Sequence, residues 1–436
     1  MNNLAETSTP IKFDSITIKS TRNATQVNIA RIVTDLTIYE HLDKPYLTGV
    51  VAFSDSEDIV GSLDIGGGEL VSVVLKTNSI DGYAPKKIEK DFYIDKIITS
   101  IKGNDTNEFF MLHLIEDIAF KSNLQNVNKS YSGSSSNIIK KISKGFLGKE
   151  IINTETDFQE MKVIVPNLTP LDAMCWVKNK TTTVDGYPHY LFSSLVEKEL
   201  IFSDLKGMIE SPVSNPLVPF MYAEANISID TKQETSRRRT ILDYSFKNTE
   251  DLFSLISKGL IGANHNYIDV TKNKYHNTKF DIQKDIIDKL KNEKSNQPLY
   301  SDLYELDGQS FNEYESREVT QLMSTLAYEG NSTYSESATK AQYKLNAINQ
   351  AMDGLLKKAP LTITVNGHDF LHGRHHSTTG TKIDVRFLRN INDHNSDNVF
   401  DPKKSGEYLI FGAKHTFTLE KYTTTFSCVK LFNGEI

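Results

Sequence analysis

The sequence EYLIFGAKHTFTLEKYTTTFSCVKL, residues 407–431, decides the fold because both of its halves are rich in the β-branched and aromatic residues that favour strands. The stretch is predicted to form two strands folded back on each other as a hairpin. A similar stretch, DFYIDKIITSIKGNDTNEFFMLHLI at 91–115, turns at Gly103, Asn104 and Asp105. The turn of the later hairpin, at Glu420 and Lys421, has no glycine, so its register stays open. One kind of long hairpin is therefore predicted at two distant places in the chain.

The composition is that of a folded, strand-rich protein of several domains. A length of 436 residues predicts about three domains, and 38% hydrophobic residues suffice for buried cores. The aromatic residues, 10% of the chain and mostly Phe and Tyr, favour strands. The net charge of −7 and the pI of about 5.9 argue against tight, sequence-independent binding of nucleic acid, which needs a basic surface.

Two cysteines, Cys175 and Cys428, are too few for a disulfide framework, and both are expected to be small buried apolar residues. No charged start is followed by an apolar segment, so we expect no secretory signal peptide. No run approaches the roughly 20 apolar residues of a membrane helix, so we expect no membrane span. These features predict folding in a reducing cytoplasm.

The order of predicted elements gives a mainly β protein with α+β insertions. We expect a first β-barrel at 1–120, a middle α+β domain at 121–220, and a second, discontinuous barrel at 221–276 and 358–436. A polar insertion and a long helix at 337–357 occupy 277–357. In the middle domain, Ile138, Ile139 and Ile142 have helical spacing. Thr169 is a good N-cap for a second helix, and strands are expected at 187–194 and 198–204.

The surroundings of the two hairpins also repeat. Before the first hairpin, Gly68 is followed by the alternating apolar residues Val71, Val73 and Leu75. Before the second hairpin, Gly380 is followed in the same way by Ile383, Val385 and Phe387. Further upstream, the strands at 32–40 and 48–55 correspond to those at 240–248 and 264–272. We interpret this as a duplication in which 10–118 matches 238–274 plus 360–432, and 408–417 takes the place of 92–101. The alternative is that any two antiparallel meanders look alike, because alternation is common.

Several stretches resemble a known family: IVTDLTIYEHLDKPYLTGVVAFSDSEDIV (32–60), NKSYSGSSSNIIKKI (128–142), VPNLTPLDAMCWVKNKT (165–181), GYPHYLFSSL (186–195), SKGLIGANHNYIDVTKNKY (257–275), LTITVNG (361–367), GTKIDVRFL (380–388) and the last hairpin. Together they are similar to the central baseplate hub protein of contractile-tailed bacteriophages, the myoviruses. They resemble more distantly the base of the valine-glycine repeat spike of type VI secretion. The stretches follow in the same order over most of the chain, but 279–332 matches poorly.

This resemblance implies two barrels of the tail-tube type in each chain, and a homotrimer whose six barrels form a ring. The ring would match the hexameric tail tube on one side and the trimeric central spike on the other, and would surround part of the DNA channel. Baseplate wedge proteins are further implied partners, and the tape measure protein is a candidate. The implied protein is a structural, non-enzymatic part of the virion, assembled in the host cytoplasm, with no sequence-specific nucleic-acid partner.

Four motifs suggest ligand sites, but each has a plainer interpretation. His368, His372, His375 and His376 form a metal-like cluster, yet Gly373 disfavours the helix that would align them, so a solvated loop is favoured. DHNSDN at 393–398 starts like a calcium loop, with Asp393, Asn395 and Asp397, but Asn398 replaces the glycine and Lys404 the final Glu. SRRR at 236–239 is interpreted as a solvated edge or protein contact, and Gly66–Gly68 lacks the following helix of a phosphate cradle.

We therefore assign no catalytic, cofactor-binding or metal-binding residue. The alternative function is an all-β carbohydrate-active or carbohydrate-binding protein, which would need two facing carboxylates and exposed tryptophan. The single tryptophan, Trp176, is predicted on a buried helix face, which disfavours that alternative. If the chain lines a DNA channel, the channel-facing charge should be zero or negative, with 237–239 directed elsewhere, because basic residues would hold the phosphates.

Overall fold

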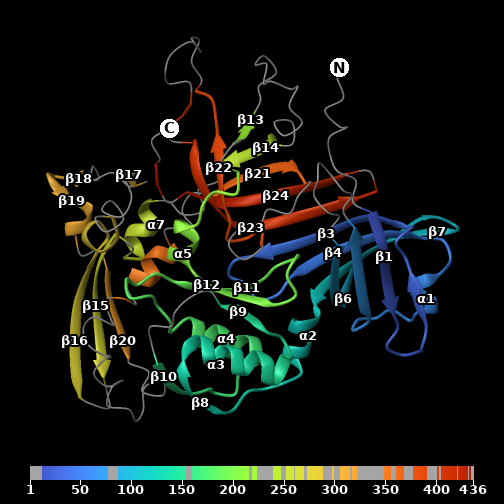
Figure 1. Ribbon diagram of the computed structural model, residues 1–436, viewed down its shortest axis with the longest axis horizontal. Helices are drawn as coiled ribbons and strands as arrows, with labels where there is room; N and C mark the ends of the chain where they lie inside the picture. Colours follow the sequence, from blue (N-terminus) through green and yellow to red (C-terminus); the bar gives the residue numbers. More distant parts are fainter. Residues whose placement is uncertain are drawn as a thin grey trace.

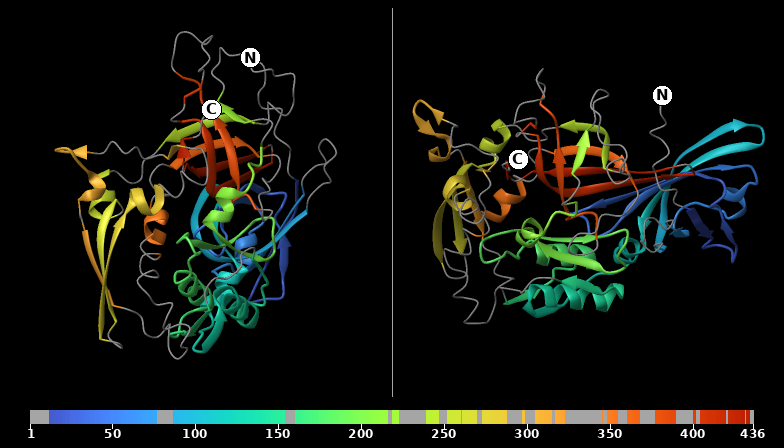
Figure 2. Two further views of the ribbon diagram at one scale, coloured as in Figure 1. Left: turned by 60° about the vertical axis from the view of Figure 1, so that its left-hand side comes forward. Right: turned by 45° about the horizontal axis from the view of Figure 1, so that its top comes forward.

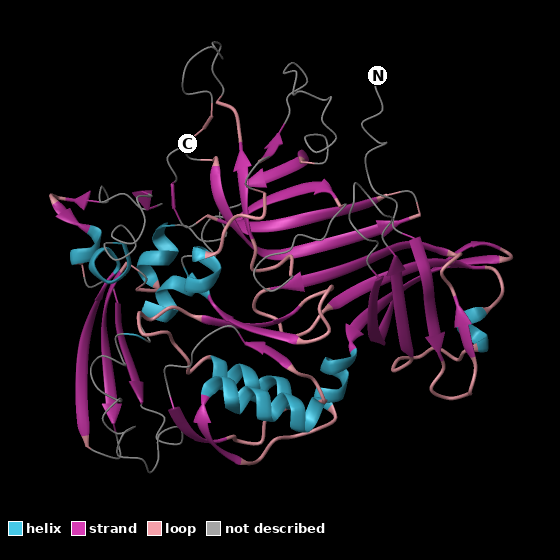
Figure 3. Cartoon of the chain, in the orientation of Figure 1, coloured by secondary structure: helices cyan, strands magenta, loops and turns pink. Residues whose placement is uncertain are grey.

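The computed structural model describes residues 12–76, 87–153, 160–215, 219–222, 239–246, 252–259, 261–269, 273–287, 297–298, 305–314, 317–322, 345, 348–354, 360–367, 377–389, 400–401, 404–419, 421–430 and 432–433. The fold is mainly β, as predicted. One large sheet curls through the molecule, and a smaller α+β layer lies against it (Figure 1; Figure 3).

The first β unit is a curled antiparallel sheet with strand order β1-β5-β6-β7-β4-β3. Its alternating apolar side chains enclose one core, which includes Ile16, Leu36 and Phe92. The short β2 pairs with β1, and among the described residues no ladder joins β1 or β2 to β3, so this unit stays open there. Its strands are β1 Lys12–Lys19, β2 Gln26–Asn28, β3 Val33–His41, β4 Thr48–Asp55, β5 Leu70–Lys76, β6 Lys87–Asn104 and β7 Asn107–Glu116.

The second β unit is a closed six-stranded barrel with strand order β13-β22-β23-β24-β21-β14. The short β13 closes it by pairing parallel with both β22 and β14. Alternating residues such as Ile363, Val385 and Phe426 fill the barrel. Its strands are β13 Phe220–Tyr222, β14 Thr240–Phe246, β21 Pro360–Asn366, β22 Lys382–Arg386, β23 Gly406–Thr418 and β24 Tyr422–Val429.

The two units share five strands in the same antiparallel order, β5-β6-β7-β4-β3 and β22-β23-β24-β21-β14. β23 lies between β22 and β24 as β6 lies between β5 and β7, so the predicted equivalence of 408–417 with 92–101 is confirmed for the strands, although an extra register shift in β6 after Ile97 displaces the last residues by one. Gly68 N–H donates to Ile94 O at 2.7 Å, and Gly380 N–H donates to Ile410 O at 2.8 Å. One residue later, both ladders have a register shift, at Asp95 and at Phe411. Such shared irregularities are not expected of two unrelated meanders.

One predicted strand equivalence is wrong. The strand expected at 264–272 is β15 Gly262–Asp269, and it does not belong to the barrel. It pairs with β16 Lys274–Asp281 and β20 Arg317–Leu322, so part of the insertion expected to be irregular forms a separate three-stranded sheet (Figure 1). The place equivalent to β4 is taken by β21, whose alternating apolar residues fill the barrel core. β15 instead pairs along its whole length with β16, which follows Asn273, a residue with φ of 49°.

The units meet where the long β23 leaves its barrel. Residues 412–418 of β23 pair antiparallel with 35–41 of β3, so thirteen strands form one continuous sheet. Figure 2 shows the red β23–β24 hairpin running onto the blue strands of the first unit. The last hairpin of the chain therefore connects the two units.

The middle α+β layer matches its predicted elements. Thr169 caps α4 by accepting a hydrogen bond from Asp172 N at 3.3 Å, and Ile138, Ile139 and Ile142 of α3 pack beneath it. The two predicted strands pair antiparallel as β11 and β12, and β9 joins β12 in parallel. The elements are α2 Asp117–Asn123, β8 Ser130–Ser134, α3 Ser135–Ile142, β9 Ile151–Asn153, β10 Glu160–Ile164, α4 Pro170–Lys178, β11 His189–Ser193, β12 Leu200–Asp204 and α5 Leu205–Glu210.

The helix predicted at 337–357 is described only at 345 and 348–354, which are helical. Ile348 and Met352 are buried there against α5 and β11 residues such as Met208 and Tyr190. This part of the helix therefore packs against the middle layer.

Candidate assembly interface

The distal half of the β6–β7 hairpin carries an unpaired sheet edge. β5 accompanies β6 only as far as Tyr93, and beyond Ile94 the outer edge of β6 has no ladder partner among the described residues. This half exposes Ile97, Ile98 and Ile101 by 38%, 43% and 56%. The hairpin projects from the body at the upper right of the right-hand view in Figure 2. An exposed apolar edge of this length is a template for pairing with another strand.

A second edge is open on β14. Only Thr240 and Ile241 of β14 pair with β13, so within the described part of the chain the outer edge from Asp243 to Phe246 has no ladder partner. Leu242 and Phe246 are 44% and 41% exposed. Phe246 packs against the rings of Tyr244 and Phe387, with centroids 6.0 Å and 5.4 Å away. Aromatic packing thus supports this edge from the barrel side.

A buried carboxylate fixes the joint between the units. Glu40 of β3 is buried, and its Oε1 accepts a hydrogen bond from Leu195 N at 2.6 Å. Its Oε2 accepts from Thr379 Oγ1 at 3.0 Å, which ties the first unit to the segment before β22. His415 Nε2 of β23 lies 3.6 Å from Oε1. Burial by itself would raise the pKa of Glu40, but the neighbouring imidazole and these donors together lower it, so the side chain stays ionised.

A second buried carboxylate, Glu116, binds the first unit to the middle layer. Its Oε1 lies 3.3 Å from Lys90 Nζ and accepts from Ser193 Oγ at 3.0 Å, while Oε2 accepts from Leu47 N at 2.7 Å. Lys90 also donates to Glu197 O at 2.6 Å. Both carboxylates are thus satisfied by donors from distant segments, which makes them structural links.

Sequence reasoning did not identify Glu40. A signal was available, because Leu36, Ile38 and Glu40 occupy alternate positions of one strand and therefore face the same side. A carboxylate on an apolar face predicts a buried, partnered charge.

The glycine motif at 66–68 is not a phosphate cradle. The N–H groups of Gly66 and Gly67 each donate to the carboxylate of Glu69 at 3.0 Å, so the chain satisfies these donors itself. Gly67 and Gly68 have φ of 116° and 89°, which favours glycine in the turn that leads into β5.

The remaining predicted residues do not converge on one site. Trp176 is half-buried, not buried as expected, and Lys180 Nζ lies 4.6 Å from its ring centroid. Cys428 is buried as expected, whereas Cys175 is half-buried and packs against the core of the middle layer. The Arg239 guanidinium lies over the ring of Phe220 at 5.0 Å, so it packs on the barrel.

The histidine cluster at 368–376, the acidic motif at 393–398 and Arg237 and Arg238 lie outside the described residues. In the part of the chain that the structure describes, no group of three or more His, Cys, Asp or Glu side chains is placed to hold a metal ion. No helix among these residues is both long and apolar enough to cross a membrane.

The whole-chain fold is shared with known tail proteins. The chain is similar to the tail protein from Neisseria meningitidis MC58, with 12% identity, a TM-score of 0.56 and 97% of each chain covered. It is also similar to the 43 kDa tail protein of prophage MuSo2 from Shewanella oneidensis, with 10% identity, a TM-score of 0.53, and 96% and 98% of the two chains covered. No family model matches the sequence, and no curated protein matches it either. The chain therefore has the fold of these tail proteins.

Proposed function

We propose that this protein is the structural hub of a contractile phage-tail baseplate, without enzymatic activity. The observation that carries the proposal is the register-level duplication: two β units of one design, joined by β23, in a chain with the fold of phage tail proteins. Three copies would present six such units. Duplication would thus let a three-fold assembly meet the hexameric tail tube on one side and the trimeric spike on the other.

The proposed partners follow from that position. The hub contacts the tail tube proteins, the central spike and the baseplate wedge proteins, with the tape measure protein as a further candidate. It resides in the tail of the virion and surrounds part of the DNA channel. The net charge of −7 supports a lining that does not hold DNA. An assembled structure with a basic lining, especially one containing Arg239, would contradict this.

The test is the mass of the purified protein, alone and with its spike partner, by native mass spectrometry. We expect a trimer or a multiple of three, with the spike partner needed if the isolated ring is weak. A chain that stays monomeric with its partners present would overturn the proposal. Among the described residues, no observation favours the carbohydrate-active alternative.

A further inference from the structure

The two strands with open edges, β6 and β14, are equivalent to two strands that already pair with each other inside the chain, β23 and β3. The pairing of β23 with β3 is called the internal joint. By the shared strand order, β14 is the counterpart of β3, and β6 is the counterpart of β23. We infer that the distal edge of β6 pairs with the edge of β14 in a second copy of this chain, and so repeats the internal joint between molecules. This inference rests on the proposed function and names the contact that would build its ring.

The register of this contact follows from the bulges. The β3–β4 ladder shifts between Val33 and Asp35, and the β14–β21 ladder shifts between Ile241 and Asp243. Asp35 therefore corresponds to Asp243, and Thr37 corresponds to Ser245, two residues later.

The β23–β24 ladder shifts between Ile410 and Gly412, and the β6–β7 ladder shifts between Ile94 and Lys96. β6 has one more shift, between Ile97 and Thr99, which adds a residue. Thr416 of β23 therefore corresponds to Ile101 of β6.

In the internal joint, Thr416 lies opposite Thr37. The equivalent contact between two copies therefore places Ile101 of one copy opposite Ser245 of the next. Lys102 then lies opposite Tyr244, and Ser100 opposite Phe246. Each of these positions belongs to an edge that exposes large apolar side chains, so pairing would bury apolar surface on both strands.

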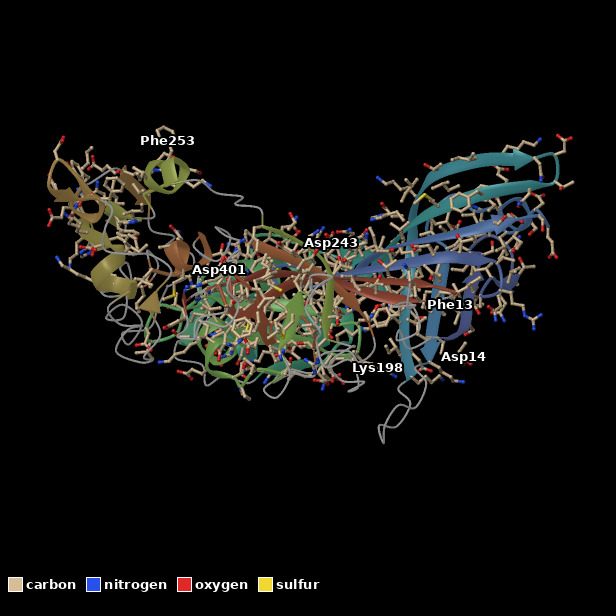
Figure 4. The ribbon with its side chains drawn as sticks, turned by 90° about the horizontal axis from the view of Figure 1, so that it is seen from above. Phe13, Asp14, Lys198, Asp243, Phe253 and Asp401 are labelled. Atoms are coloured by element: carbon tan, nitrogen blue, oxygen red, sulfur yellow. The ribbon has the colours of Figure 1, made fainter. Side chains whose placement is uncertain are left out.

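One molecule cannot make this contact with itself. Figure 4 places Asp243 in the middle of the molecule, whereas the β6–β7 hairpin extends to the far end of the first unit. The contact joins two different surfaces, so it is head-to-tail and generates a ring when the rotation closes.

The test is disulfide trapping between two single-cysteine additions, Ile101→Cys and Ser245→Cys, mixed before assembly. Directly opposite residues of an antiparallel ladder have Cα atoms about 4.5–5.5 Å apart, within the range of a disulfide. Under mild oxidation we expect a covalent dimer in the mixture and none in either variant alone, because the contact is head-to-tail. The parent protein gives the baseline for Cys175 and Cys428, whose thiol pKa values are raised by burial.

The matched control mixes Ser100→Cys with Ser245→Cys, which is displaced by one residue and directs the two side chains to opposite faces. It should trap at least several-fold less dimer. Hydrogen exchange of the amides at 99–102, which should slow on assembly, gives a second measurement on the unmodified chain.

The same samples are weighed by native mass spectrometry. An oligomer of unchanged mass that lacks the covalent dimer, or that traps the control pair equally, would overturn this inference and leave the proposed hub intact. A monomer in the presence of its partners would overturn both.

Discussion

The first β unit and the second barrel differ most in what covers one equivalent strand edge. The outer edge of β3 is covered by β23 of the same chain, whereas the described outer edge of β14 is open from Asp243 to Phe246. β6 and β23 show the reverse relation: the distal half of β23 pairs with both β3 and β24, whereas the distal half of β6 pairs only with β7 among the described strands. The same strand design therefore has a covered edge in one unit and an edge without a described partner in the other.

The units also differ in closure. β13 closes the second barrel by parallel pairing with both neighbours, whereas β1 lies antiparallel to β5, and no described strand joins β1 to β3. The five shared strands are therefore the common design, and the sixth position is where each unit departs from it.

The largest effect should come from breaking the internal joint with Glu40→Ala. The change leaves Leu195 N and the imidazole of His415 without the buried carboxylate. A buried donor left without its acceptor costs about 1–3 kcal/mol. The free energy of unfolding, from chemical denaturation, should fall by that amount, whereas Glu57→Ala, at an exposed position, should change it little.

The pH dependence of that variant gives an independent check. The pKa of Glu40 is lower in the folded protein than its ordinary 4.5, so the folded state binds this proton less readily than the unfolded state. The contribution of Glu40 to the free energy of unfolding is complete at pH values above its ordinary pKa. It is lost as the pH falls through the lowered pKa of the folded state. The difference between parent and Glu40→Ala should therefore shrink in acid. A difference that grows in acid would contradict the assignment.

The buried lysines provide a second comparison. Lys90 of the first unit lies 3.3 Å from the Glu116 carboxylate, whereas Lys430 of the second donates to the Ser405 carbonyl at 2.6 Å. Burial lowers the pKa of Lys430 from 10.5 to about 8. Between these two pKa values, Lys430 is protonated in the unfolded chain and largely deprotonated in the folded protein. The free energy of unfolding of the parent protein should therefore increase as the pH rises, by at most about 1.4 kcal/mol per pH unit.

Lys430→Met should remove this slope between about pH 8 and 10.5. The measurement is chemical denaturation across that range, with Lys421→Met, at an exposed position, as the control. An unchanged slope in the Lys430 variant would show that this lysine is not the group responsible.

The equivalent glycines sharpen the comparison further. Gly68 and Gly380 have φ of 89° and 81°, a backbone region that costs other residues roughly 1–2 kcal/mol. A Cβ at Gly68 would meet only Phe120, at 3.9 Å, whereas at Gly380 it would lie 3.4 Å from Phe192 and 3.5 Å from Met208. Gly380→Ala should therefore cost more than Gly68→Ala. The reverse order of unfolding midpoints would refute the packing argument.

Sequence patterns could predict the strands, the capped α4 helix and the two equivalent hairpins, because these depend on alternation and local chemistry. They could not assign β15, since alternation shows that a strand exists but not which strand it pairs with. Nor could they identify the partners of Glu40, because Leu195 and Thr379 lie 155 and 339 residues away. The candidate interface could not be predicted for the same reason, because a strand edge is known to be open only when the pairing of all neighbouring strands is known.

The smallest effects should come from one cross-strand ion pair in each unit. Lys76 and Asp14 join β5 to β1 at 2.8 Å, with side chains 50% and 39% exposed. Lys382 and Glu407 join β22 to β23 at 2.7 Å, but the Lys382 side chain is only 8% exposed. An exposed pair contributes about 0–1 kcal/mol and is screened by salt.

Asp14→Asn should therefore lower the free energy of unfolding by less than about 1 kcal/mol, and the loss should fade at high salt. Glu407→Gln should cost more and depend less on salt, because it leaves a buried ammonium with a weaker acceptor. Denaturation of both variants at low and high ionic strength checks this. Equal costs and equal salt dependence would mean that the second barrel shields its ion pair no better than the open first unit does.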